Sequence, residues 1–248
     1  MDPLRKPLEG IGHIIRFNWH LYVLAGGMIL CILAAGFLIW PSIQTYALIA
    51  CLLVALPICS SLIVSLYVYD LSKLYTFDWL EPHINEPRTL VNIHAGFDEC
   101  SKLLIRRFPN AKLQVFDFYD PVRHTEISIK RARRAYPPFP GTLPIRTGAI
   151  PLENQSTDTI FLILAAHEIR DEKERLAFFR ELKRILKPHG RIVVTEHLRD
   201  LPNFLAYSVG FFHFIPGWRW LKAFRESGLR LESHFRITPF IHTFIVCH

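Results

Sequence analysis

The sequence predicts an α/β fold: a Rossmann-like, seven-stranded sheet whose last strand is antiparallel, preceded by a two-helix transmembrane hairpin. Three observations predict it. Residues 21–70 contain two long uncharged runs separated by a short turn. Residues 89–248 alternate short apolar runs with amphipathic ones, as a sheet with crossover helices does. Within that region, Leu90–Asp117 reads as strand, tight turn, helix and a strand ending in an acid, which is the first βαβ unit of a nucleotide-binding sheet.

The composition indicates a membrane-associated protein with a basic surface. The 248 residues are 50% hydrophobic with a mean hydropathy of +0.21, and the apolar excess lies in the first third of the chain. The net charge is +7 and the pI is about 9.3. Basic surfaces attract nucleic acid or anionic lipid, and an adjacent apolar segment favours lipid. The five cysteines form no CxxC pair, so we expect a reducing compartment and no disulfide framework.

The first 70 residues predict a basic N-terminal segment, 1–20, and then a membrane hairpin, 21–70. Leu21–Trp40 and Tyr46–Tyr69 carry no charge, and each is long enough to cross a hydrocarbon core as a helix. Pro41–Thr45 leaves room only for a turn. Because basic residues favour the cytoplasmic side, we expect both termini and the following domain to be cytoplasmic. A signal peptide would have one short apolar run, and a hairpin buried in a soluble protein would have a polar face.

Residues 71–88 are expected to be a linker, and residues 89–248 an α/β domain. The predicted strands are Leu90–His94, Leu113–Asp117, Leu143–Arg146, Asp158–Ala165, Arg191–Glu196, Leu229–Thr238 and Ile241–Cys247. The predicted helices are Asp98–Phe108, Thr125–Ala135, Asp171–Leu186 and Trp218–Ser227. The last two strands flank Pro239 and are expected to form an antiparallel hairpin at the sheet edge.

The second half of the chain contains the motifs that carry a family resemblance. Pro151 and Ser156-Thr157-Asp158 precede the fourth strand, Arg184–Gly190 reads RILKPHG, and the fifth strand ends at Glu196. With these motifs the region resembles class I S-adenosylmethionine-dependent methyltransferases, especially the branch that acts on quinones and other lipids. The resemblance covers about Thr89–His248 and implies S-adenosylmethionine as the cofactor. It says little about the substrate.

The cofactor turn departs from the family pattern, which is acid-x-Gly-x-Gly-x-Gly at the end of the first strand. Asn92 stands at the acid position, His94 at the first glycine and Asp98 at the third, so only Gly96 is kept. Glycine matters there because the backbone must turn sharply and approach the ligand. The resemblance implies cofactor contacts from Asn92, His94, Ala95 and Gly96. Either the motif has drifted and binding is retained, or the cofactor pose or the activity has changed. The competing interpretation is that the turn binds a nicotinamide dinucleotide, and a single glycine in the turn is poor support for it.

Further cofactor contacts are implied after the second, third and fourth strands. Asp117 ends the second strand, where an acid pairs with ribose hydroxyls, although it could instead cap the following turn. Phe118 is placed to pack on the adenine. Gly148 and Ala149 follow the third strand, and Ala165 ends the fourth.

Two pairs of ionisable residues follow neighbouring strands, so both are expected to face the same crevice. His167-Glu168 follows the fourth strand and Glu196-His197 the fifth. Methyl transfer to a hydroxyl needs positioning and a base. We therefore predict His167, Glu168 and His197 as the catalytic residues, with a structural hydrogen-bonding role as the alternative for each histidine. No group of His, Cys and Asp has metal-ligand spacing along the chain, so the sequence predicts no metal.

The segment Leu201–Trp220 is unusually aromatic and falls between the fifth strand and the next helix. It predicts a substrate lid or an interfacial helix, with core packing as the alternative. The run Lys130–Arg134 predicts a basic helix face that is either solvated or in contact with anionic lipid. The lid residues are Phe204, Tyr207, Phe211, Phe212, His213 and Trp218.

Together these features predict a membrane-tethered methyltransferase that acts on a hydrophobic, lipid-soluble acceptor, such as a quinone or a lipid headgroup, at the cytoplasmic membrane face. The predicted partners are membrane lipids and a hydrophobic small molecule, with no nucleic acid, and the oligomeric state is left open. One alternative is a catalytically silent methyltransferase-like scaffold or cofactor-sensing subunit. Another is an enzyme with a soluble substrate, in which the hairpin serves only for placement.

Overall fold

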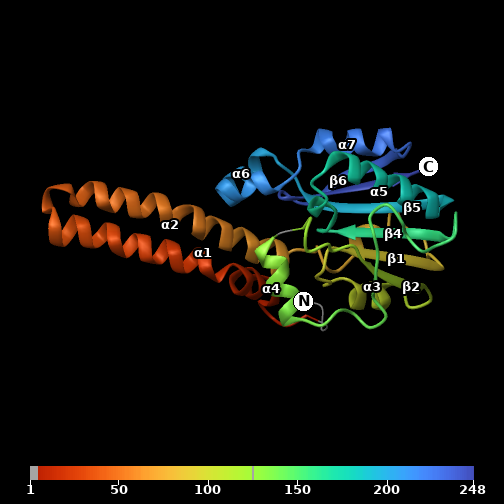
Figure 1. Cartoon of the computed structure of the whole chain (residues 1–248), viewed down its shortest axis with the longest axis horizontal. Coiled ribbons are helices and arrows are strands. Elements are labelled where there is room, and N and C mark those ends of the chain that lie inside the picture. The colour runs from red at the N-terminus through yellow and green to blue at the C-terminus, as the bar shows by residue number, and fades with distance from the viewer. Residues whose placement is uncertain (1–4, 125) are drawn as a thin grey trace.

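Two long helices pair at the N-terminal end of the chain and project from an α/β domain (Figure 1). The computed structural model describes residues 5–124 and 126–248. Helix α1 (Glu9–Ala34) continues into the wider turn η1 (Ala35–Ile39), and α2 (Gln44–Leu66) into η3 (Tyr67–Leu71). The short helix η2 (Pro41–Ile43) joins them. Helix α1 therefore begins inside the predicted N-terminal segment 1–20, of which residues 1–4 lie outside the described part.

The hairpin exposes its apolar side chains instead of burying them. Both helices are long and apolar enough to cross a membrane, yet only 6% of the most apolar stretch of each is buried. The two helices pack on each other near the tip, where a Cβ at Gly36 would lie 2.5 Å from that of Ala47. The hairpin is therefore not the buried core of a soluble fold, whose apolar helices would be largely covered.

The domain contains a seven-stranded sheet in the order β3-β2-β1-β4-β5-β7-β6. The first five strands are parallel, and β7 runs antiparallel to both β5 and β6. The predicted mixed sheet is thus confirmed, and so is the antiparallel hairpin of the last two strands, in which β6 is the edge strand. The strands are β1 (Thr89–His94), β2 (Lys112–Asp117), β3 (Leu143–Pro144), β4 (Thr157–Ile163), β5 (Leu186–His197), β6 (Arg230–Thr238) and β7 (Ile241–Cys247).

Helices cover both faces of the sheet because successive strand residues point to opposite sides. Val91 and Ile93 pack with α5 (Glu172–Ile185) and α7 (Gly217–Glu226), whereas Leu90 packs on the other face with α3 (Ser101–Arg107). Three further segments lie at the hairpin end of the domain (Figure 1): α4 (Ile127–Ala135), α6 (Leu201–Tyr207) and η6 (Ser208–His213). Helix α4 contacts α1, and α6 contacts α2.

The expected linker, residues 71–88, is part of the packed domain. Leu74, Phe77 and Leu80 are completely buried in the same cluster as α3. The short helix η4 (Asp78–Leu80) belongs to this segment. The hairpin is therefore joined to the sheet by a hydrophobic contact.

Element boundaries differ from the predictions where side chains decide them. Helix α3 begins at Ser101 because the Asp98 carboxylate accepts hydrogen bonds from the Cys100 and Ser101 amides, at 2.9 and 3.0 Å. Strand β5 begins at Leu186, which pairs with Thr157 of β4; the Lys-Pro-His-Gly run that follows is an irregularity in the pairing, which resumes at Arg191. Helix α4 begins at Ile127, and Thr125, its predicted start, lies outside the described residues.

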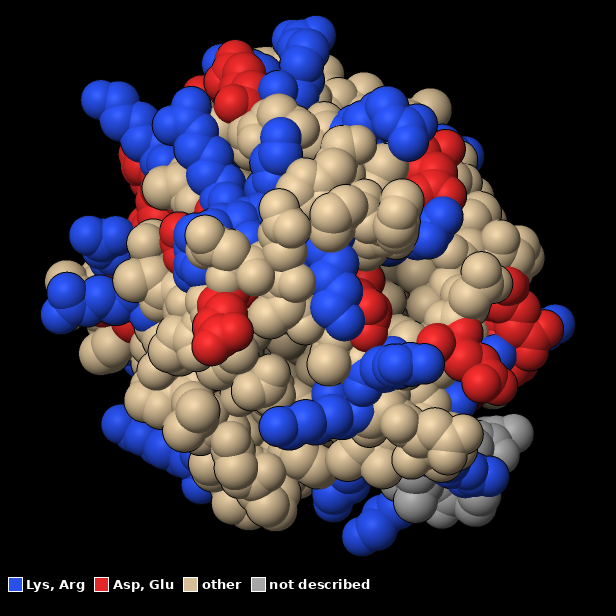
Figure 2. Space-filling model, turned by 90° about the vertical axis from the view of Figure 1, so that its right-hand side faces the viewer, with Lys and Arg blue, Asp and Glu red and all other residues tan. Residues whose placement is uncertain are grey.

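The basic character of the chain is visible at the end of the domain that faces away from the hairpin. Figure 2 shows Lys and Arg side chains spread over this face with Asp and Glu among them. Ion pairs in the domain include Lys187 with Asp158 at 2.8 Å and Arg191 with Glu232 at 2.9 Å. On this face, positive charge is therefore partly compensated.

Candidate functional site

A cavity of about 260 Å³ lies between the base of the hairpin and the carboxyl ends of the central strands. Its sheet side comes from the ends of β1, β4 and β5. His167, Glu168 and His197 line it, as expected, whereas Glu196 is buried, bonds to His167 and lies outside the lining. Its other wall is formed by α1. The lining from the domain includes Asn92, His94, Ala95, His167, Glu168, His197 and His213, and the lining from α1 is Gly10, His13, Ile14, Phe17 and Asn18.

The Asp70 carboxylate holds the two ends of the hairpin together. The Gly10 and Ile11 amides at the start of α1 each donate to Asp70, at 2.8 Å. A Cβ at Gly10 would lie 2.4 Å from that of Tyr69, so only glycine allows this approach. The start of α1 is thereby held against the end of η3, beside the cavity.

Glu99 attaches the base of the hairpin to the turn after β1. Its carboxylate accepts hydrogen bonds from Arg5 at 3.2 Å, Tyr75 at 2.9 Å and His13 at 3.1 Å. Burial alone would raise the pKa of Glu99, but these donors outweigh burial and lower it. The sequence does not predict this cluster, since Glu99 falls in a predicted helix and His13 lies 86 residues away.

The turn after β1 contains one residue with a positive φ angle, Gly96, and one buried hydrogen-bond donor without a partner among the described residues, on His94. Gly96 has φ +94, a conformation that favours glycine. Burial lowers the pKa of His94 more than Asp98 and Asp117 raise it, so the ring is neutral. Because His94 Nδ1 accepts the Gly96 amide at 3.1 Å, the proton lies on Nε2. That buried N–H has no partner among the described residues.

Asp117 ends β2 beside His94, as the strand register requires. One carboxylate oxygen accepts the Tyr119 amide at 2.9 Å, which is the predicted turn cap. The other is paired with Arg133 of α4. The Arg133 side chain also covers the turn, since a Cβ at Gly96 would lie 2.9 Å from its Cδ. The space beside the predicted ribose-binding acid is therefore filled by a side chain of this protein.

Four other predicted cofactor residues lie away from the cavity lining. Phe118 is buried against His124 and Phe178, Ala165 lies in the same core, and Gly148 and Ala149 are exposed in the turn after β3. Asn92 replaces the acid of the family pattern and donates to Asp98 and Ser101. The roles of these residues remain predictions.

His167 has no free nitrogen. Its Nδ1 lies 2.6 Å from Glu196 and its Nε2 3.2 Å from Glu168. Burial lowers the pKa of His167, but the two carboxylates outweigh this effect and raise the pKa to about 10. The same contacts lower the pKa of Glu168, against the opposing effect of burial. As the described side chains stand, His167 is protonated and has no available lone pair near neutral pH, and the ionised Glu168 is only a weak base.

His197 has the protonation state of a base. Burial lowers the pKa of His197 to about 4, despite the hydrogen bond to Asn203. Its Nδ1 lies 2.9 Å from Oδ1 of the Asn203 side chain, so Nδ1 carries the proton and Nε2 is the acceptor. The Tyr69 hydroxyl donates to this Nε2 at 2.9 Å, and both residues line the cavity.

The predicted lid brings one of its six residues into the cavity. His213 lines it, together with Phe214. The others lie outside the lining, and Phe204, Phe212 and Trp218 are exposed, which argues against the core-packing alternative for these three. The segment lies against the hairpin, where Ser60 of α2 donates to the Leu205 carbonyl at 3.2 Å.

Comparisons with known proteins agree with this architecture. A family model described as "Methyltransferase domain" matches residues 122–194, which run from before α4 into β5. No curated protein compared with the chain matches it.

Among solved structures, the fold is similar to one in a complex between the Haloferax volcanii Trm112 methyltransferase activator and a methyltransferase. The identity is 14%, the TM-score is 0.51, and the match covers 71% of this chain and 89% of that chain. The PH0226 protein of Pyrococcus horikoshii OT3 matches with 10% identity, a TM-score of 0.50 and the same two coverages. A SAM-dependent methyltransferase from Aquifex aeolicus matches with 16% identity and a TM-score of 0.49, over 70% of this chain and 91% of that chain.

Proposed function

We propose that this chain, which contains an S-adenosylmethionine-dependent methyltransferase domain, methylates a hydrophobic, lipid-soluble acceptor at the cytoplasmic surface of a membrane. A quinone or a lipid headgroup satisfies this description. The hairpin anchors the enzyme, and the domain draws its acceptor from the bilayer.

The residues around the Gly96 turn fit the cofactor. S-adenosylmethionine supplies an electrophilic methyl group on a sulfonium. His94 offers an unpartnered buried N–H, and Asp98 an unpartnered buried carboxylate oxygen. Gly96 supplies the positive φ of a tight turn, and Asp117 supplies the acid after β2. These four residues would hold the cofactor once Arg133 has left Asp117.

One observation carries the proposal for the acceptor: the wall of the cavity is a stretch of the hairpin itself. Gly10, His13, Ile14 and Phe17 of α1 line the same space as the residues after β4 and β5. Farther along the same helix, side chains such as Leu24 and Leu30 are exposed and apolar. An acceptor that slides along α1 out of the hydrocarbon layer therefore reaches the cavity with little travel through water.

The surface beside α2 also suits a membrane on the hairpin side of the domain. Leu205, Val209 and Phe212 of the lid segment are at least 64% exposed. Exposed apolar groups of this size next to a long apolar hairpin suit an interface with lipid. On α4, Arg131 bonds to the Phe17 carbonyl and to His20, so this basic helix lies beside α1 near the membrane surface.

His197 and Tyr69 are the groups best placed to accept a proton from a hydroxyl acceptor. The neutral His197 Nε2 accepts the Tyr69 hydroxyl proton. The Tyr69 oxygen keeps a lone pair toward the cavity and can accept the proton of an acceptor hydroxyl while passing its own to His197. In this account, His167 and Glu168 shape the opposite side of the cavity.

The test is to fill the cavity from the hairpin side. Ile14→Trp adds bulk to the wall, whereas Ile15→Trp places the same bulk on an exposed position of the same helix turn. Transfer of labelled methyl into total membrane lipid is measured in nanodiscs, together with calorimetric binding of S-adenosylhomocysteine.

We expect Ile14→Trp to lower transfer by more than about 10-fold while S-adenosylhomocysteine affinity is kept, and Ile15→Trp to leave both unchanged. Unchanged transfer in Ile14→Trp would refute the proposed acceptor path. Failure of the wild-type protein to bind S-adenosylhomocysteine would favour the catalytically silent alternative.

A further inference from the structure

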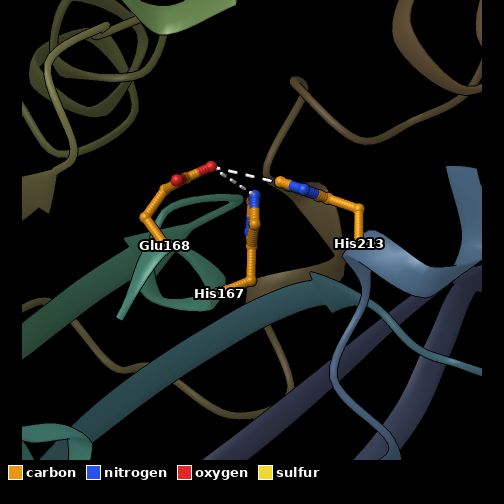
Figure 3. Close-up of side chains that lie close together, drawn as sticks. All are labelled: His167, Glu168 and His213. Atoms are coloured by element: carbon orange, nitrogen blue, oxygen red, sulfur yellow. Dashed lines mark ion pairs between the residues drawn. The ribbon is translucent and has the colours of Figure 1, made fainter. Parts of the chain in front are cut away.

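His167, Glu168 and His213 converge at the lid side of the cavity (Figure 3). We propose that these three side chains form a binding site for a divalent transition-metal ion, with zinc as the best-fitting ion. The site is independent of the proposed acceptor and is tested by metal binding alone. Spacing along the chain does not indicate such a site, because His213 lies 45 residues beyond Glu168, in the lid segment η6.

Two of the three donor separations are those of a tetrahedral centre. His167 Nε2 lies 3.2 Å from Glu168 Oε1, and His213 Nε2 lies 3.5 Å from the same oxygen. All three donors lie within 4.8 Å of one another. Zinc bonds of about 2.0–2.1 Å at tetrahedral angles place neighbouring ligand atoms about 3.3 Å apart. A cation between the three side chains therefore needs only small side-chain shifts.

Each imidazole is oriented by a carboxylate on its other nitrogen. His167 Nδ1 lies 2.6 Å from Glu196, and His213 Nδ1 lies 3.1 Å from Glu126. A carboxylate at Nδ1 keeps a proton there, which is the usual support of metal-bound histidines. A metal ion would then take the place of the Nε2 proton of His167 and, at His213, of the Arg170 guanidinium, which lies 2.9 Å from Nε2. Both Nε2 atoms point to the same Glu168 oxygen (Figure 3), so the outer contacts prepare both ligands for one ion.

The local charge also suits a divalent cation. Glu168, Glu196 and Glu126 carry three negative charges, and Arg170, whose guanidinium lies against the His213 ring, carries one positive charge. With both imidazoles neutral, these four groups leave a net charge of minus two. One divalent ion balances this charge.

The donor set selects the class of ion. Two imidazoles and one carboxylate suit zinc and its neighbours among the divalent transition metals better than magnesium or calcium, which prefer oxygen-only shells. Three protein ligands leave a fourth position, as open zinc sites do. Because His213 belongs to η6 and the other two ligands follow β4, the ion would also tie the lid to the sheet.

The experiment measures zinc binding to the full-length protein in nanodiscs, produced without a polyhistidine tag and stripped with a chelator. Competition with a chromophoric chelator gives the Kd, and elemental analysis gives the stoichiometry. We expect one zinc ion per chain. His213→Gln and Glu168→Gln should each weaken binding by more than about 100-fold, and Glu126→Gln by about 10-fold. His189→Gln, on an exposed histidine, is the matched control.

Two measurements on the wild-type protein do not depend on how the variants fold. Cobalt(II) should give the absorption spectrum of a four-coordinate nitrogen and oxygen site, without a thiolate charge-transfer band. Zinc should slow hydrogen exchange of the η6 amides. The proposal is overturned if wild-type zinc binding is weaker than about 1 mM. Equal affinity in His213→Gln and His189→Gln, or an unchanged exchange rate in η6, also overturns it.

Discussion

The Arg133 guanidinium on α4 pairs with the Asp117 carboxylate at the end of β2, directly against the Gly96 turn. An acid at this place in the fold is the one expected to meet the ribose of the cofactor. In the structure, the Asp117 carboxylate is paired with Arg133 instead. If Asp117 binds the ribose, the cofactor must displace Arg133. The apparent affinity for the cofactor is then lowered, because only molecules without the Arg133–Asp117 contact can bind it.

Removing the competing side chain should strengthen cofactor binding. Arg133→Ala is expected to tighten S-adenosylhomocysteine binding by about 5-fold, because Asp117 is then free in every molecule. Asp117→Asn should weaken binding by more than about 10-fold. Calorimetry in detergent checks both, with the exposed neighbour Arg134→Ala as the control. Weaker binding in Arg133→Ala would mean that the arginine supports the cofactor.

The buried, neutral His197 should make folding sensitive to acid. Its pKa is about 4 in the folded chain and about 6.5 when unfolded. The unfolded state therefore takes up a proton first as the pH falls. The contribution of His197 to the free energy of unfolding is fully present above about pH 6.5. It is lost progressively toward pH 4, by about 3 kcal/mol in total. Denaturant unfolding across this pH range should show a flatter profile for His197→Asn than for the wild type.

The acid profile has a control in a histidine that does not line the cavity. His83 stacks on Phe235 outside the cavity, and His83→Asn should keep the wild-type slope. A slope that is the same in the wild type, His83→Asn and His197→Asn would show that His197 is not the neutral buried group described above.

The stability of the first turn of α1 should depend on Asp70. Its carboxylate accepts the Gly10 and Ile11 amides and stands at the positive end of the helix dipole. Asp70→Ala is expected to cost about 1 kcal/mol and to speed hydrogen exchange at these two amides. Asp70→Asn should cost less because one acceptor oxygen remains. Asp78→Ala, on an exposed aspartate, is the control, and equal exchange rates in all three variants would contradict the cap.

Gly190 should be essential for the pairing of β5 with β4. A Cβ there would lie 2.8 Å from the Asp158 carbonyl oxygen and 2.7 Å from a Leu186 methyl group. Because backbone cannot give way cheaply, Gly190→Ala should lower the free energy of unfolding by about 2 kcal/mol. Gly148→Ala, which has open space around it, should change stability by less than about 0.5 kcal/mol. Similar unfolding midpoints for the two variants would contradict this packing.

The order of elements in the domain could be predicted because it depends on local patterns. Apolar strands, amphipathic helices and the Leu-Lys-Pro-His-Gly block are all legible over short stretches, and the seven-stranded sheet follows from them. The hairpin was equally legible from two uncharged runs. The predicted convergence of His167 and His197 followed from the rule that parallel strands end at one edge.

The remainder of the site depends on contacts between distant segments, which periodicity does not encode. His13 meets Glu99, and His213 meets Glu168, only because the hairpin base and the lid fold over the strand ends. Arg133 was read as part of a basic helix face, and its pairing with Asp117 needed the position of α4. Residues 71–88 looked like a linker because their aromatics follow no strand or helix period, yet those aromatics cover one face of the sheet.

The most direct test of the account is the solubility of the methylated product. Full-length protein in liposomes of total membrane lipid is incubated with S-adenosylmethionine carrying a tritiated methyl group, and label is measured after organic extraction. We predict enzyme-dependent label in the organic phase, reduced by Asp117→Asn. Label confined to the aqueous phase, or no incorporation at all, would contradict a methyltransferase that takes its acceptor from the bilayer.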